Sequence, residues 1–249
     1  GMKFKDHNIF RLGDITKSNH GQIFEKVESL GFKVGAVSPM NASNKLNDPS
    51  YFIPDPWTKT NPDSSFLSKS IYEAIVQAVN DNASSKLTLK TILNLCVAFI
   101  FLVNPIGWIN MAFYAASSIR KSWRKAIFLD KLLFEIHLTL FKKKKPEFST
   151  LFLNAGAHIQ HHYFLNSPHI NFKGVKNPEW FIKKNQDPLL DVLYEYDKMI
   201  CSLLDLKDVE IIIATGLSQT PFEETKFYYR LKQHKEFLSL FNIEYKDIF

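Results

Sequence analysis

Apolar residues recur along this chain at two spacings, and their alternation predicts an α/β fold. Stretches with apolar residues three or four positions apart are typical of helices that bury one face, and they cover residues 21–30, 68–83 and 189–204. Short, nearly continuous apolar runs are typical of parallel strands covered on both faces, and they cover residues 32–38, 150–154 and 209–214. We expect a single domain over residues 1–249, in which helices sandwich a mostly parallel sheet.

The most apolar segment, residues 87–119, predicts a helical hairpin. Its strongest part is shorter than the about 20 apolar residues that span a membrane, and the Asn104-Pro105 step interrupts it. The second arm continues to Phe141, where the lysine run Lys142–Lys145 ends it. We expect the hairpin to form an insertion or cap within the domain, over residues 86–145, with a membrane-associated hairpin as the alternative.

Composition narrows the class of protein. The 249 residues are 45% hydrophobic and 22% charged, which excludes a disordered or fibrous chain. The net charge of +6 comes mostly from scattered lysines, so we expect no nucleic-acid partner. Cys96 and Cys201 lie in apolar helical sequence, which indicates reduced core cysteines. Because no apolar leader follows Met2, these features together predict a cytoplasmic protein.

The candidate functional residues follow the expected strands. Parallel sheets bind ligands beyond the carboxyl ends of their strands, so these positions are where a site is expected. The clearest feature is a histidine cluster after the expected strand at 150–154, formed by His158, His161 and His162. On a helix, His158 shares a face with His161 or His162, a spacing that suits zinc or another divalent metal. The histidines are also explained as polar residues of a loop over the crevice. Both interpretations stay open, and the second needs no cofactor.

A second feature is a stiff, proline-rich loop at residues 48–57, within a stretch rich in Asn, Asp and Pro at 41–62. Asp55 and Trp57 of this loop, with Tyr163 beside the histidines, are the candidate substrate-binding residues. A purely structural loop explains the same sequence. No P-loop, Rossmann, serine-hydrolase or zincin motif occurs, so these enzyme classes are not leading interpretations.

Several short segments form an ordered set along the chain. They are Gly31–Gly35, Phe52–Trp57, Gln160–Phe164, the helix at 189–204, Ile211–Ser218 and Phe227–His234. In this order they resemble the alkaline phosphatase-like superfamily, in particular its type I phosphodiesterase and nucleotide pyrophosphatase-like branch. Gln160–Phe164 is similar to that branch's Asp-x-x-Gln-His-x-(aromatic)-Trp motif, whose Asp and His bind a metal. Ile211–Ser218 is similar to its strand that ends in Ser-Asp-His-Gly.

The resemblance implies metal-ligand roles for His161 and for His234 in the last segment. Ala157 stands where the motif has Asp, and residues 215–218 contain no Asp-His pair. The first strand of the family, with its metal-binding Asp and the nucleophile that follows, has no counterpart in this sequence. The resemblance therefore implies a degenerate or N-terminally truncated member. Such a protein binds, or weakly hydrolyses with a single divalent metal, a small phosphate or sulfate ester of a glycan or nucleotide.

The alternative function comes from a different class. It is a noncatalytic interaction or membrane-peripheral protein that uses the apolar hairpin and the Lys142–Lys145 turn. Lysines near an anionic surface attract it, whereas an isolated lysine run most often forms a solvated turn. The sequence leaves this choice open.

Overall fold

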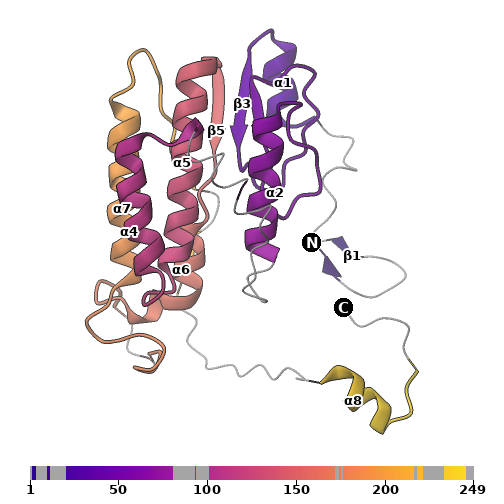
Figure 1. Ribbon diagram of the computed structural model, residues 1–249, viewed down its shortest axis with the longest axis vertical. Coiled ribbons are helices and arrows are strands. Elements are labelled where there is room, and N and C mark those ends of the chain that lie inside the picture. The colour runs from indigo at the N-terminus through magenta and orange to yellow at the C-terminus, as the bar shows by residue number, and fades with distance from the viewer. Residues whose placement is uncertain are drawn as a thin grey trace.

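The computed structural model describes residues 2–3, 10–11, 21–80, 93, 101–171, 174, 176–215, 218–220 and 233–244 (Figure 1). Within these residues the protein is α/β, which confirms the predicted class. Its strands are β1 (Met2–Lys3), β2 (Phe10–Arg11), β3 (Val34–Val37), β4 (Tyr51–Ile53) and β5 (Phe148–Leu151). Its helices are α1 (Ile23–Ser29), α2 (Phe66–Asn80), α4 (Pro105–Ser117), α5 (Arg124–Lys144), α6 (Ala155–Tyr163), α7 (Pro188–Leu204) and α8 (His234–Leu240), with a 3-10 turn at Phe164–Asn166.

The central sheet is parallel, as expected, and has the order β4-β3-β5. All four residues of β3 are buried between the two neighbouring strands and the helices that cover them. Alternate side chains of a strand point to opposite faces. Val34 and Ala36 therefore pack with Phe24 of α1, whereas Val37 packs in the larger core with α2 and α5. β1 and β2 form a separate antiparallel pair.

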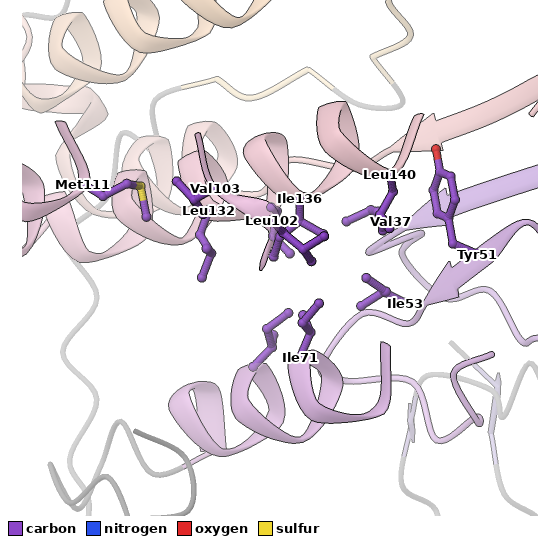
Figure 2. Close-up of a cluster of buried hydrophobic side chains, with 12 residues drawn as sticks. Val37, Tyr51, Ile53, Ile71, Leu102, Val103, Met111, Leu132, Ile136 and Leu140 are labelled. Carbon is purple, nitrogen blue, oxygen red and sulfur yellow. The ribbon is translucent and has the colours of Figure 1, made fainter. Parts of the chain in front are cut away.

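The long helix α5 joins the sheet to the other helices. It contacts β3 and β5 as well as α4, α6 and α7, and Figure 1 shows these helices gathered next to β5, with α1 and α2 beside β3. Figure 2 shows the main core, where Leu132 and Ile136 of α5 face Ile71 of α2. Burying each such side chain contributes about 1.5–3 kcal/mol, so this contact is a large part of what holds the sheet to the helical layer.

In the described part of the predicted hairpin, α4 and α5 are separate helices. α4 ends at Ser117 and α5 begins at Arg124, so the second arm is not the continuous helix expected as far as Phe141. Residues 81–92 and 94–100, including Cys96, lie outside the described residues. None of the helices in the described ranges is long and apolar enough to cross a bilayer.

Three details of the predicted fold are wrong. Residues 209–214 are not a strand, and Ile212 and Ile213 are 81% and 66% exposed. Strand formation depends on a neighbouring strand, which a local apolar run does not specify. β4 lies inside residues 41–62, where the Asn, Asp and Pro content predicted only a loop. Cys201 lies in a helix as expected, but it is exposed rather than in the core.

The close packing of β3 against β4 can be tested at Gly35. A Cβ atom at Gly35 would lie 2.7 Å from Tyr51 Cε1 and 2.8 Å from the Tyr51 hydroxyl. The ring has little freedom to move, because a 2.6 Å hydrogen bond joins its hydroxyl to Ser149 Oγ. We expect Gly35→Ala to lower the free energy of unfolding, measured by urea denaturation, by about 1–3 kcal/mol.

The matched control is Gly21→Ala, because a Cβ atom at Gly21 meets only Glu25 Oε2, at 3.6 Å. This control should unfold at nearly the wild-type urea concentration. If both variants were equally stable, the Tyr51 ring would not lie over β3 as described.

Candidate functional site

The carboxyl ends of β3 and β4 lead into two loops, residues 38–50 and 54–65, that border an open groove. Parallel pairing brings both strand ends to the same edge of the sheet. The groove has a volume of about 610 Å³ and is lined by Ser43, Asn44, Lys45, Lys59, Thr60, Asn61 and Tyr72. A groove of this size accommodates a small-molecule ligand.

The buried carboxylate of Asp55 ties the two loops together. In the first loop the backbone N–H of Asn41 donates to it at 3.0 Å. In its own loop it accepts hydrogen bonds from the backbone N–H groups of Trp57 and Thr58, at 2.8 and 3.0 Å, and from the Thr58 hydroxyl at 2.6 Å. Asp55 is 0% exposed. It therefore shapes the loops and offers no oxygen to a ligand in the groove.

Further hydrogen bonds fix the groove walls. The backbone N–H of Asn44 donates to Thr60 Oγ1 at 2.9 Å, which links the lining of one loop to that of the other. Tyr72 donates its hydroxyl hydrogen to the Thr58 carbonyl at 3.1 Å, and burial raises the pKa of this tyrosine. The backbone N–H of Ser43 donates to Gln22 Oε1 at 2.9 Å. These bonds order the walls without any ligand.

The charge of the groove comes from Lys45 and Lys59, whose side chains are exposed. None of the lining residues is an Asp or Glu, and the amides and hydroxyls among them add hydrogen-bond donors. Ammonium, amide and hydroxyl donors suit the oxygens of a phosphate or sulfate group. Trp57 lies in the same loop as Lys59 and is 49% exposed, so its ring is available to a sugar or a base.

Sequence reasoning missed both lysines of the groove. Lys45 precedes β4 and Lys59 follows it, and only the pairing of β4 with β3 brings them to one edge. The short apolar run of β4, Tyr51–Ile53, was the signal that would have placed them there.

The predicted histidines lie on α6, beyond the carboxyl end of β5. The rings of His158 and His162 are neighbours, with their centroids 4.7 Å apart. Partial burial lowers the pKa of both imidazoles, and repulsion from the neighbouring histidines lowers it further. His161 is directed elsewhere, with its Nε2 3.5 Å from Gln219 Nε2. α6 thus presents one pair of neutral imidazoles and one separate histidine.

Asp130 of α5 holds the amino end of α6. Its carboxylate accepts hydrogen bonds from the backbone N–H groups of Asn154 and Ala155, at 3.1 and 2.7 Å, and from the Tyr196 hydroxyl at 2.6 Å. Burial raises the pKa of Asp130 to about 6, although these hydrogen bonds lower it. Asp130 is therefore a positioning residue for the histidine-bearing helix.

The predicted metal ligands do not converge. Across the described ranges, no three His, Cys, Asp or Glu side chains are grouped closely enough to hold an ion. His158 and His162 supply two imidazoles, whereas a catalytic zinc takes three protein ligands. His234 is exposed at the start of α8, which Figure 1 shows away from α6. The described residues therefore do not fit the zinc centre that the resemblance implies.

Tyr163, the third predicted substrate-binding residue, lies in the core. Its ring stacks on Phe181 with a centroid distance of 5.2 Å, and a 3.1 Å hydrogen bond joins its hydroxyl to Ser122 Oγ. In the described part of the chain, no hydrogen bond or ring contact links Tyr163 or the α6 histidines to Asp55 or Trp57. The residues predicted as one site thus fall into two regions, the loops after β3 and β4, and α6.

The pairing of His158 with His162 can be tested by a pH titration followed by NMR. We expect both imidazoles to titrate below the ordinary pKa of about 6.5, because partial burial and neighbouring histidines disfavour their charged forms. His161→Gln should raise both titration midpoints, since it removes one of the repelling charges. Midpoints at or above the ordinary value, or midpoints unmoved by His161→Gln, would contradict this arrangement.

Comparisons of the chain with models of known families, with curated proteins and with solved structures gave no match. The resemblance to the alkaline phosphatase-like superfamily accordingly stays a prediction from the sequence.

Proposed function

We propose that this protein binds a small phosphate or sulfate ester, carried on a glycan or a nucleotide, in the groove between residues 38–50 and 54–65. The observation that carries the proposal is the presence of Lys45 and Lys59 in a groove whose lining contains no carboxylate. Two ammonium groups favour an anionic ligand over a neutral or cationic one. The predicted resemblance points to the same ligand class.

Order in the groove walls supports this function. Immobilising side chains and loops when a ligand binds costs free energy, and a preformed site avoids much of that cost. Asp55 already fixes the backbone on both sides of the groove, and the Asn44–Thr60 hydrogen bond joins its walls. A small anion that contacts the two exposed lysines therefore meets a lower ordering cost in this groove than in a flexible one. The exposed ring of Trp57 is the candidate contact for the sugar or base.

The proposed activity is binding without turnover. Two-metal ester hydrolysis uses cations about 3.5–4 Å apart that stabilise the attacking and leaving oxygens. Such cations need several converging ligands, whereas His158 and His162 form only a pair. The groove and the histidine pair also have no residue in common. Nothing in either region supplies both an activated nucleophile and a place for the ester.

The two lysines provide the test of this function. We expect the protein to bind p-nitrophenyl phosphate or p-nitrophenyl sulfate in calorimetric titrations. Lys45→Gln and Lys59→Gln should each weaken binding by roughly threefold to fivefold, because each removes one partly screened charge contact. Lys69→Gln is the matched control, since Lys69 is an exposed lysine of α2 outside the groove lining.

Affinity that was unchanged in Lys45→Gln and Lys59→Gln, or lowered equally by Lys69→Gln, would overturn the proposed site. Turnover is measured separately, with bis-p-nitrophenyl phosphate in the presence of zinc or manganese. Metal-dependent turnover that disappeared in His161→Ala would show that the protein is a hydrolase and that binding alone is the wrong activity.

A further inference from the structure

An apolar face on α4 is a feature that the groove does not explain. Ile109 and Phe113 lie on the side of α4 opposite Met111, which is buried against α5, and Trp108 is a further exposed residue next to Ile109 along the helix. Ile109 is 76% exposed and Phe113 is 57% exposed, and Phe101, just before α4, is also exposed. We call Phe101, Trp108, Ile109 and Phe113 the α4 face. Aromatic and aliphatic side chains grouped in this way mark an interaction surface.

Both ends of the α4 face carry positive charge. At one end, Lys143 of α5 donates from its Nζ to the Phe101 carbonyl at 3.3 Å, within the exposed Lys142–Lys145 run. At the other end, the exposed residues Arg120 and Lys125 follow α4. No Asp or Glu occurs anywhere in the sequence from residue 101 to residue 129.

The acidic side chains that approach α4 from neighbouring helices are either paired with basic side chains or partly buried. Asp191 of α7 pairs with Arg124 at 3.1 Å, and Glu195 pairs with Lys131 at 2.7 Å and with Lys198 at 2.6 Å. Glu135 of α5 is partly buried, and burial raises its pKa. The net electrostatic character of the α4 face and its rim is therefore positive.

We propose that the α4 face docks on the surface of an anionic lipid bilayer, with α4 lying in the plane of the interface. Helices that bind in this way combine Trp, Phe and aliphatic residues on one face with lysines and arginines at its margin. α4 has 13 residues, fewer than the about 20 that span a bilayer, so the contact that we propose is peripheral. α4 is attached to the body through Met111 and α5, which orients the whole protein on the membrane.

Charge complementarity favours this occupant over a second copy of the chain. In a symmetric dimer the same patch meets itself, so the basic rims around two α4 faces would lie against each other. Like charges brought together at an interface oppose association. An anionic bilayer instead attracts every lysine of the rim while it accepts the apolar side chains.

The test is co-sedimentation of the full chain with vesicles of phosphatidylcholine that contain phosphatidylserine. We expect binding to these vesicles and at least roughly tenfold weaker binding to phosphatidylcholine alone, since each lysine near an anionic surface contributes a factor of about five. Ile109→Asp should abolish binding, because it brings a negative charge into the interface. Phe66→Asp is the matched control and should bind like wild type, since Phe66 at the start of α2 is 74% exposed.

A second variant keeps the proposal testable if Ile109→Asp does not fold, which circular dichroism establishes. Lys142→Gln combined with Lys144→Gln changes only exposed side chains and should weaken vesicle binding roughly 25-fold, because each lysine contributes a factor of about five. The proposal is overturned if wild-type protein stays in solution with anionic vesicles, or if Ile109→Asp folds and binds them unchanged. It is also overturned if Ile109→Asp abolishes self-association or capture of an acidic protein while vesicle binding is absent.

Discussion

The four hydrogen bonds to the buried Asp55 carboxylate are the constraint on which the candidate site depends. A buried carboxylate without partners is strongly destabilising, so the surrounding N–H and O–H groups must stay in place for the protein to remain folded. They come from both loops, with Asn41 on one side and Trp57 and Thr58 on the other. The stability of the fold and the shape of the groove are therefore set by the same interaction. Lys45 and Lys59 lie on walls that Asp55 holds.

The helical layer is organised by buried polar contacts of α5. Asp130 fixes the amino end of α6 and bonds Tyr196 of α7, while Lys131 pairs with Glu195. Apolar packing alone would let helices slide past one another, whereas such pairs lose much of their free energy when displaced. α5 packs against the side of α4 that carries Met111, and Ile109 and Phe113 on the other side are exposed. The groove with its positive charge and the apolar face with its positive rim are separate surfaces of the protein, with no residue in common.

The sequence alone predicted those elements whose start, end or burial depends on neighbouring residues in the chain. Asp187 and Pro188 predict the start of α7, and Asp187 accepts hydrogen bonds from the backbone N–H groups of Leu189 and Leu190. The apolar run around Val34–Val37 predicts β3, whose burial on both faces follows directly. The histidines were correctly placed beyond a strand, but the sequence left open whether they lie on a helix or in a loop, and their spacing could not reveal that His161 turns toward Gln219.

The local sequence pattern could not predict features that depend on contacts between distant parts of the chain. The isoleucines at 211–213 have strand-forming side chains, but no local signal states whether a neighbouring strand is present. Asp55 was expected to meet a ligand, because an isolated carboxylate in a loop carries no sign of the backbone groups that surround it after folding. Lys45 and Lys59 became one site only through the pairing of β3 with β4.

A crystal structure of the protein with p-nitrophenyl sulfate bound tests the central claim most directly. We predict that the sulfate oxygens lie within hydrogen-bond distance of the Lys45 and Lys59 ammonium groups, with the loops around Asp55 unchanged. A sulfate bound instead at His158 and His162, or a groove that rearranges to admit it, would contradict the account of a preformed anion site.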